Sequence, residues 1–248
     1  MASCEVYRHN EPVRITTEQA LLIRCEAANV IVQKGGRPVL VEELDGNARR
    51  MIKLWWFPGR AWRTLPHPGF ERFCEACESL RDRDVVAPEV VERGQVAGSP
   101  VRWVVYPKIA GDPLNRLSDW KRFALLPSLS AWVRRLHDQG CYSRALSLAN
   151  VLALPDARLG ITDVSETQFS RRSLGYGRRV RNLGRFLAHP RDTAWWLESA
   201  GPRFIEDYAR GACLAPDRLW RDVSRNVASR TRRRARRRRY KAPDRGAD

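Results

Sequence analysis

The sequence is poor in lysine and lacks any long apolar run. Five of its 45 basic residues are lysines, and all the others are arginines. Because no run approaches the roughly 20 apolar residues that span a bilayer, the sequence predicts no membrane-spanning helix. The first residues contain no apolar signal-peptide core, so we expect no secretory leader. The scarcity of lysine makes a lysine inside an apolar stretch informative.

Six cysteines are scattered along the chain, and two of them are three residues apart. Cys74 and Cys77 form a C-x-x-C motif, but no second pair and no nearby histidine completes a zinc site. Both positions fit a helical pattern, so we interpret them as small residues of a helix. Without a disulfide framework, we expect a reducing, cytoplasmic compartment.

The composition is that of a folded protein with a large positive charge. Hydrophobic residues make up 43% of the 248 residues, and nine are tryptophan, which argues against global disorder. This length accommodates one large domain or two lobes. The formal net charge of +17 implies anionic partners such as nucleic acid, acidic lipid or a phosphorylated small molecule, without choosing among them.

The first half of the sequence is typical of a small β lobe that follows a helical extension at residues 1–28. The turn signals Gly35-Gly36 and Asp45-Gly46 separate stretches rich in β-branched residues. We predict strands at residues 29–33, 39–44, 48–56 and 102–107, a helix at residues 70–83, and a turn that leads into a further strand at residues 85–92. These elements predict an antiparallel β lobe over residues 29–107.

Lys53 stands among apolar neighbours on a predicted strand, in Met-Ile-Lys-Leu-Trp. One interpretation is an edge-strand lysine that protects the edge of the sheet. The other is a cation that a rigid strand holds against the phosphates of a nucleotide. A glutamate of the following helix would then pair with it, and we prefer Glu75, with Glu71 second.

The second half is mainly helical. We predict helices at residues 118–137, 178–188, 193–197 and 202–213, with Pro127 interrupting the first. A loop and β-hairpin occupy residues 141–165, with strands at residues 150–154 and 159–163. We therefore predict a helical lobe over residues 108–224. Residues 225–248 form a basic tail that contains Arg232–Arg239, and we expect it to be disordered.

The hairpin carries a family resemblance. Leu-His-x-x-Gly-x-Tyr precedes Ser143-Arg144-Ala145-Leu146, three further residues and Asn150, and Ile161-Thr162-Asp163 ends the hairpin. Upstream, Gly35-Gly36, Asp45-Gly46 and Lys53-Leu54 follow in the matching order. Over residues 29–210 the sequence resembles the bacterial lipopolysaccharide-kinase group of the protein-kinase-like fold, and within it the toluene tolerance proteins.

The resemblance implies an α+β, two-lobed protein-kinase-like fold and a set of site residues. Lys53 would hold the phosphates of ATP and Glu75 would pair with it, while the Gly35-Gly36 turn would contact the nucleotide. Asn150 and Asp163 would ligate Mg²⁺, which prefers hard oxygen ligands close to phosphates. ATP and Mg²⁺ are therefore the expected cofactors.

The sequence departs from the usual kinase pattern at the catalytic base. Ala145 stands where the His-Arg-Asp motif of kinases has its aspartate, which the toluene tolerance branch commonly lacks, and Asp163-Val164-Ser165 replaces Asp-Phe-Gly. A general base contributes roughly 10²–10⁴-fold to a rate, so its loss weakens phosphotransfer without abolishing it. Ser143, Ser147 and Glu166 are the candidate substitutes.

Three functions remain open from the sequence. The first is an ATP-dependent kinase that phosphorylates a lipopolysaccharide-core or other envelope sugar or lipid at the inner face of the cytoplasmic membrane. The second is an inactive pseudokinase that acts as a regulator or scaffold at the membrane. The third, nucleic-acid binding through the arginine-rich tail, lacks a supporting motif. We favour attachment of Arg232–Arg239 to an anionic membrane surface over nucleic acid.

Overall fold

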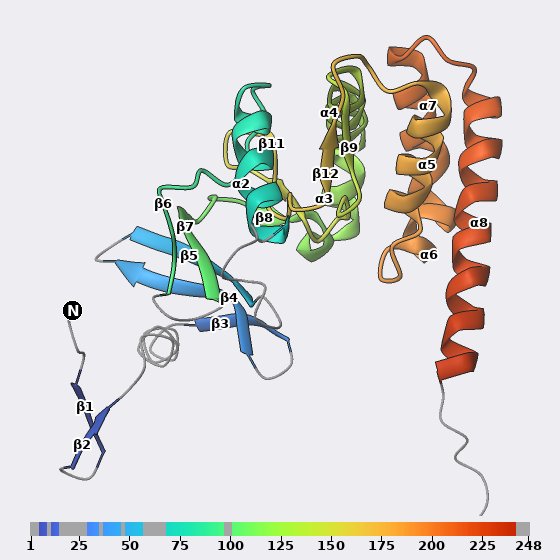
Figure 1. Ribbon diagram of the computed structural model, residues 1–248. Helices are drawn as coiled ribbons and strands as arrows, with labels where there is room; N and C mark the ends of the chain where they lie inside the picture. Colours follow the sequence, from blue (N-terminus) through green and yellow to red (C-terminus); the bar gives the residue numbers. More distant parts are fainter. Residues whose placement is uncertain are drawn as a thin grey trace, which may run out of the picture. The chain divides into compact units, whose positions relative to one another are not determined.

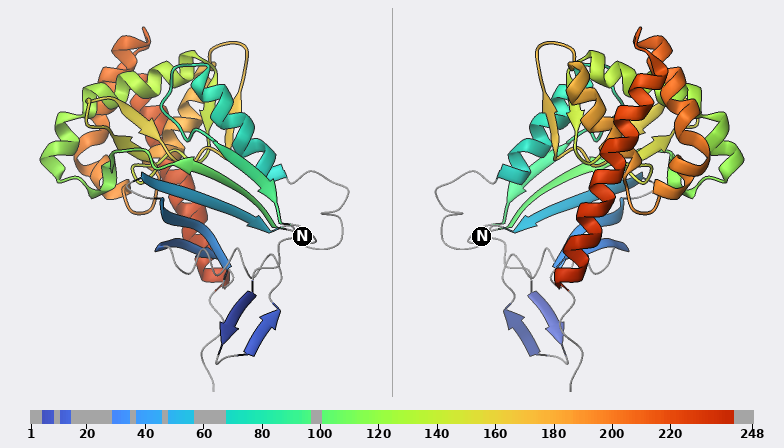
Figure 2. Two further views of the ribbon diagram at one scale, coloured as in Figure 1. Left: turned by 90° about the vertical axis from the view of Figure 1, so that its left-hand side faces the viewer. Right: turned by 90° about the vertical axis from the view of Figure 1, so that its right-hand side faces the viewer.

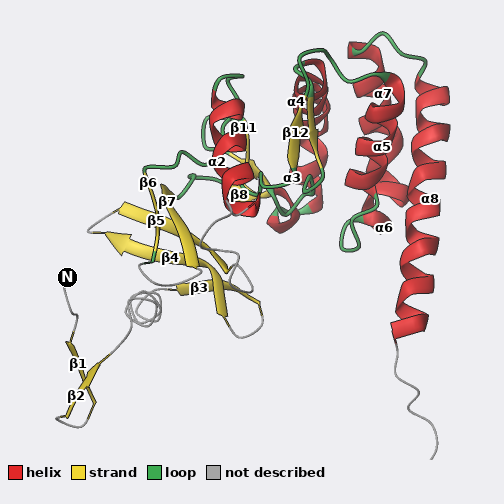
Figure 3. Ribbon diagram, in the orientation of Figure 1, coloured by secondary structure: helices red, strands yellow, loops and turns green. Residues whose placement is uncertain are grey.

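The chain divides into two compact units, residues 1–109 and 110–248. The division falls two residues beyond the predicted boundary between the lobes. This computed structural model describes residues 5–8, 11–14, 29–34, 37–45, 48–56, 68–96 and 101–241. Figure 1 labels most of their helices and strands, and Figure 3 shows that strands dominate the first unit and helices the second. The predicted α+β class is confirmed.

The first unit is built on a five-stranded antiparallel sheet with the order β3-β4-β5-β7-β6. Its strands are β3 (Asn29–Lys34), β4 (Arg37–Asp45), β5 (Ala48–Trp56), β6 (Glu92–Gln95) and β7 (Val101–Pro107). Val41, Ile52 and Val105 from its three inner strands are buried in one apolar cluster. Four of the predicted strands are therefore present, and the strand expected within residues 85–92 begins only at Glu92, as the edge strand β6.

The N-terminal extension differs from its prediction where the structure describes it. A separate hairpin is formed by β1 (Glu5–Arg8) and β2 (Glu11–Arg14), with Val6 opposite Val13. The predicted helix lies at residues 16–25, outside the described residues. The helix at residues 16–25 therefore stays a prediction, and the hairpin within residues 5–14 was not expected from the sequence.

Aromatic side chains hold helix α2 (Pro68–Arg81) against the sheet. The ring of Trp55 on β5 lies 5.7 Å from that of Phe70 and 5.4 Å from that of Phe73. Phe70, Phe73 and Cys77 are buried, as their helical spacing predicts. One face of α2 therefore belongs to the core of the first unit, and the other faces solvent.

The helices of the second unit surround an aromatic core. Phe186 and Phe204 each lie 5.1 Å from Trp196, between ring centroids, and all three side chains are fully buried. The helices are α3 (Asp119–Ala124), α4 (Leu126–Asp138), α5 (Tyr176–Leu187), α6 (Thr193–Trp195), α7 (Gly201–Gly211) and α8 (Pro216–Lys241), with a π turn at Trp196–Ala200. The expected break near Pro127 is confirmed, because α3 and α4 meet at Leu125.

Helix α8 corrects the expectation of a disordered tail. It continues without interruption to Lys241, as both views in Figure 2 show for the long red helix. Val223 and Val227 are buried, and the Arg234 guanidinium donates to the Ala188 carbonyl at 3.1 Å. Apolar contacts near its start thus hold a segment whose later residues are almost all charged. Disorder is therefore wrong for residues 225–241.

Candidate functional site

The hairpin of strands β10 (Val151–Ala153) and β11 (Leu159–Ile161) carries Asn150 and Asp163 at its open end. Val151 pairs with Ile161, so the preceding and following residues also face each other. The Thr162 amide and hydroxyl both donate to the Asn150 carbonyl, at 3.0 and 3.3 Å. The strand register therefore places Asn150 beside the residue that precedes Asp163, as the sequence predicts.

The loop that leads into this hairpin is fixed at both ends. The Asn150 side-chain amide donates to the Ala145 carbonyl at 2.7 Å, and the Arg144 amide donates to the Glu166 carbonyl at 3.1 Å. Leu146 and Leu148 are buried beneath the loop. These contacts hold the backbone of Ala145 in one position.

The residues at the end of the hairpin fit a magnesium ion that is bound together with phosphate. The NH₂ group of Asn150 is engaged with the loop, and its side-chain oxygen is the atom left to ligate a cation. Asp163 is half-buried and accepts a hydrogen bond from Ser165 at 3.4 Å. Within the described residues, no three His, Cys, Asp or Glu side chains form a metal cage. Mg²⁺ ordinarily takes one or two protein oxygens and completes its shell with phosphate and water.

The three residues considered as substitutes for the missing base differ in their accessibility. Ser143 and Ser147 are buried, so neither hydroxyl is open to an acceptor. Glu166 is exposed, and its carboxylate lies 3.5 Å from Nε of Arg144, the residue before Ala145. Among the three candidates from the sequence, accessibility therefore favours Glu166.

A buried chain of hydrogen bonds supports the loop from below. Arg179 donates to the Tyr208 hydroxyl at 2.9 Å, and that hydroxyl lies 2.8 Å from Nδ1 of His137. Nε2 of His137 lies 2.9 Å from the Asn182 side-chain oxygen, and the Asn182 amide donates to the Ser143 carbonyl at 2.7 Å. Because Asn182 accepts from Nε2, that nitrogen carries the proton and Nδ1 accepts from Tyr208.

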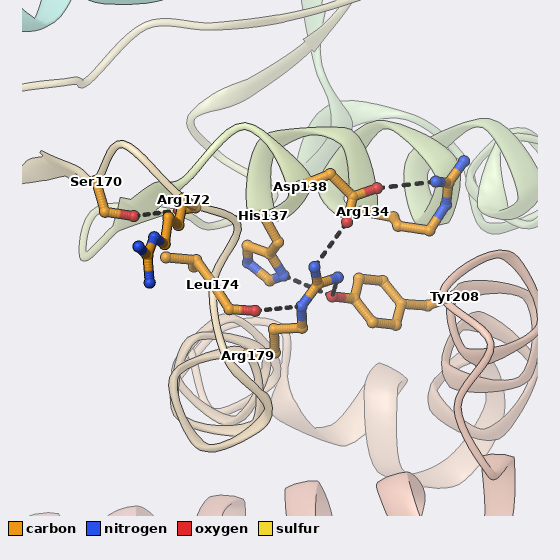
Figure 4. Close-up of polar contacts among 8 residues, drawn as sticks. All are labelled: Arg134, His137, Asp138, Ser170, Arg172, Leu174, Arg179 and Tyr208. Atoms are coloured by element: carbon orange, nitrogen blue, oxygen red, sulfur yellow. Dashed lines mark hydrogen bonds and ion pairs between the residues drawn. The ribbon is translucent and has the colours of Figure 1, made fainter.

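Burial keeps His137 and Tyr208 in the protonation states that these hydrogen bonds require. Burial lowers the pKa of His137 to about 4, so the imidazole is neutral at pH 7. It also raises the pKa of Tyr208 to about 12 and keeps the hydroxyl protonated. Figure 4 shows Arg179 reaching Asp138, at 2.7 Å, as well as Tyr208 and the Leu174 carbonyl. His137 therefore supports the loop and is closed to substrate.

A glycine makes the turn from α4 into strand β9 (Cys141–Ser143), which pairs with β12 (Thr167–Phe169). Gly140 has φ of +78°, a left-handed conformation that other residues rarely adopt. A Cβ at this position would also lie 2.8 Å from the Arg172 carbonyl oxygen. Only glycine therefore fits at this turn after helix α4.

This buried series of hydrogen bonds was not predicted from the sequence, although the sequence of α5 contained an indication of it. Arg179 and Asn182 occupy the inward face of α5, where the amphipathic pattern predicts apolar side chains. Buried polar residues are ordinarily hydrogen-bonded, so their presence on this face indicates a polar partner. The partners, on α4 and α7, cannot be identified from spacing within α5.

In the first unit, Lys53 lies on a central strand. Its neighbours in the sheet are β4 and β7, so the interpretation as an edge-strand lysine is wrong. Its Nζ atom lies 4.6 Å from the ring centre of Phe73 and 5.5 Å from that of Trp55. A half-buried ammonium over two aromatic faces is stabilised by cation–π attraction. The side chain is therefore directed toward the buried face of α2.

The partner predicted for Lys53 lies on the other face of this helix. Glu75 is exposed, whereas Phe73, the residue whose ring lies below the Lys53 ammonium, is buried. Glu71, the second choice, lies 3.3 Å from Arg102 on β7. The geometry lends the Lys53–Glu75 pair no support, and the pair stays a prediction. Gly35 and Gly36 lie outside the described residues.

The C-x-x-C motif has the structural role expected for it. Cys74 and Cys77 are free thiols buried on the inward face of α2. Burial raises the pKa of Cys77 to about 12, against the opposing effect of the nearby Lys53 charge. A thiol so rarely ionised is a poor nucleophile and a poor metal ligand.

Comparison with solved structures places the chain in the protein-kinase-like fold. The aminoglycoside phosphotransferase APH(3'')-Id from Streptomyces rimosus is 15% identical and aligns with a TM-score of 0.56, over 86% of this chain and 99% of its own. An aminoglycoside-3'-phosphotransferase of type VIII is 16% identical, with a TM-score of 0.60, over 85% and 98%. At this level of identity the likeness concerns the fold alone, and the predicted fold is confirmed.

The comparisons give no support to the lipopolysaccharide-kinase group in particular. No protein-family profile and no curated protein matches the sequence. An aminoglycoside 2'-phosphotransferase IIIa variant in its GDP complex aligns over 85% of this chain and 84% of its own, with 15% identity and a TM-score of 0.53. In the described parts of the chain, no helix has the length and apolarity to cross a membrane.

Proposed function

We propose that this protein binds ATP with Mg²⁺ and catalyses slow phosphoryl transfer. The observation that carries the proposal is the pair of oxygen ligands at the end of the β10–β11 hairpin. Asn150 is oriented by its bond to the Ala145 carbonyl, and Asp163 follows the residue that is bonded to Asn150. Solved structures of the same fold, whose names include complexes with ADP and GDP, support a nucleotide as the ligand.

In this proposal each residue has a separate task. Lys53 supplies a fixed positive charge for the nucleotide phosphates, and Asn150 and Asp163 hold the metal. The metal would neutralise charge that develops on the transferred phosphoryl group. Glu166 is the carboxylate that could accept a proton from the acceptor, because it is accessible and lies beside Arg144. The tasks of Lys53, which would hold the phosphates, of Glu75, which would pair with Lys53, and of Gly35 and Gly36, which would contact the nucleotide, rest on the resemblance alone.

The proposed acceptor follows from the sequence resemblance, and the proposed cellular location from the cysteines and the surface charge. An envelope sugar or lipid is the acceptor class that the sequence resemblance implies. Four described cysteines are free thiols, which favours a reducing, cytoplasmic compartment. Attachment to the inner face of a membrane would use the exposed arginines of α8.

The proposal is tested by titrating ATP into the wild type and two aspartate variants, with and without Mg²⁺. Asp163→Ala should weaken Mg²⁺-dependent binding by about tenfold or more, because a metal ligand is lost. Asp156→Ala is the matched control: Asp156 lies at the opposite end of the same hairpin and bonds Arg158 at 2.7 Å. The proposal would be contradicted if ATP bound equally well with and without Mg²⁺, or if both variants lost the same affinity for ATP.

A pseudokinase is the second candidate, and Ala145 is the observation that favours it. The two serines nearest the missing base are buried, which leaves Glu166 as the accessible candidate among those considered. Formation of ADP from ATP in the presence of envelope sugar or lipid acceptors separates the two functions. Nucleotide binding without any ADP formation, in the wild type and in Glu166→Gln alike, would identify a pseudokinase.

A further inference from the structure

An arginine-lined groove of about 490 Å³ lies between α5 and α8. Among the described residues that line it, six are arginines and none is a carboxylate. The six are Arg181, Arg185, Arg230, Arg233, Arg234 and Arg237. We call this surface the arginine groove.

The groove is built from two helical stripes. On α8, residues 230, 233, 234 and 237 follow the three- and four-residue spacing of a single helix face. On α5, Arg181 and Arg185 are one turn apart. The basic run seen in the sequence is therefore divided, because Arg233 and Arg237 line the groove while Arg232 and Arg236 do not.

The hydrogen bonds that two of the groove arginines donate go to uncharged oxygen atoms and leave their positive charge unneutralised. Arg185 donates to the Arg144 carbonyl at 3.5 Å, and Arg230 to the Asn226 side-chain oxygen at 2.7 Å, both neutral acceptors. Nε of Arg185 is buried without a hydrogen-bond partner among the described residues. Burial and the charges of Arg185 and Arg233 lower the pKa of Arg230. An anion in the groove would relieve this repulsion.

We propose that the arginine groove binds a small ligand that carries at least two phosphate groups. Guanidinium forks match phosphate oxygens in two-point contacts, and several such groups call for a ligand with several negative charges. The volume lies within the range of roughly 300–1,000 Å³ that is usual for small-molecule sites. Because Arg185 also bonds the carbonyl of Arg144, the ligand would lie close to the loop that contains Ala145.

The test is a calorimetric titration of inorganic tripolyphosphate into the full chain, in EDTA and without nucleotide. Arg233→Gln with Arg237→Gln should raise the dissociation constant by about tenfold or more, since two charge-assisted contacts are lost. Arg232→Gln with Arg236→Gln is the matched control, with the same helix, spacing and charge change. It should alter the constant by less than about twofold. Circular dichroism checks that α8 remains helical in both proteins.

Several outcomes would overturn the proposal. An equal loss in the two double variants would assign binding to the general charge of α8, and no loss in either would place the phosphates elsewhere. If vesicles containing phosphatidylglycerol or a single-stranded RNA bind while tripolyphosphate does not, the groove is a surface for a macromolecule.

One further variant distinguishes binding at the proposed nucleotide site from binding in the arginine groove. Lys53→Gln, which removes the cation proposed to hold the nucleotide phosphates, should bind tripolyphosphate in EDTA as the wild type does, whether or not the protein binds ATP. A loss in this variant would assign the phosphates to the proposed nucleotide site and overturn the groove proposal, while leaving the proposed function intact.

Discussion

At the scale of single residues, Ala145 combines a fixed backbone with a missing functional group. Its carbonyl accepts the Asn150 amide at 2.7 Å, and the preceding residue, Arg144, donates its amide to Glu166. Its side chain is a methyl group, which neither accepts nor donates a proton. The loop therefore retains the arrangement that positions a metal ligand, whereas the residue that would take a proton is absent.

This arrangement predicts that Ala145→Asp increases turnover. A carboxylate added to a held backbone could act as the base, which is worth roughly 10²–10⁴-fold. We expect faster phosphate release from ATP and an unchanged dissociation constant for the nucleotide. Ala145→Asn is the control of equal size without a basic carboxylate. Equal rates in the two variants would show that position 145 does not face the reacting atoms.

At the scale of secondary-structure elements, three helices meet in the chain of hydrogen bonds below the loop. His137 comes from α4, Asn182 from α5 and Tyr208 from α7, and the first two are hydrogen-bonded to each other. The side-chain amide of Asn182 donates in turn to the Ser143 carbonyl at 2.7 Å. Because every member is buried, loss of one leaves its neighbour unsatisfied, which costs about 1–3 kcal/mol.

The neutral state of His137 predicts a loss of stability in mild acid. The unfolded chain takes up a proton near pH 6.5, whereas the folded protein does so only near pH 4. The unfolded state therefore binds more protons between these values, and the free energy of unfolding falls as the pH falls through this window. The full difference is about 3 kcal/mol.

This dependence is measured by urea unfolding between pH 7 and pH 5. The wild type should lose stability over this range, while His137→Gln, which cannot titrate, should show a flatter profile from a lower starting value. The other three histidines are unchanged in the variant, so they cancel in the comparison. An identical slope in both proteins would assign the acid sensitivity to other groups.

At the scale of the whole molecule, the excess positive charge lies almost entirely in the second unit. Residues 110–248 carry a net charge of +15, out of +17 for the whole chain, and the arginine groove gathers six of their arginines on two helices. Attraction to a polyanionic matrix depends on the summed field, while binding of a small phosphate ligand depends on a few close contacts. We therefore expect that a substitution can weaken binding of a small phosphate ligand without a matching change in binding to a polyanionic matrix.

This separation predicts that the two double arginine variants leave a heparin column at nearly the same salt concentration. Each lowers the net charge from +17 to +15 by removing two arginines from α8. Both should therefore elute slightly earlier than the wild type. Much earlier elution of Arg233→Gln/Arg237→Gln alone would show that the groove also dominates binding of long polyanions.

The sequence by itself determined the main elements and the hairpin. Strands β3, β4, β5 and β7, the helices α2 and α5, and the neighbouring positions of Asn150 and Asp163 all follow from spacing and turn residues. These features depend on residues close together in the chain, whose periodicity and turn preferences are local properties. Helix α8 was missed, because a run of arginines alone does not indicate which apolar residues will anchor it.

Only the tertiary structure decided how side chains from different elements meet. It placed Phe73 and Cys77 on the face of α2 toward which Lys53 points, and left Glu75 exposed. It joined His137, Asn182 and Tyr208 below the loop, and divided the basic run between the arginine groove and solvent. Each outcome depends on the rotation of one element against another, which is set by packing of side chains distant in the sequence. Spacing within a single element carries no information about that rotation.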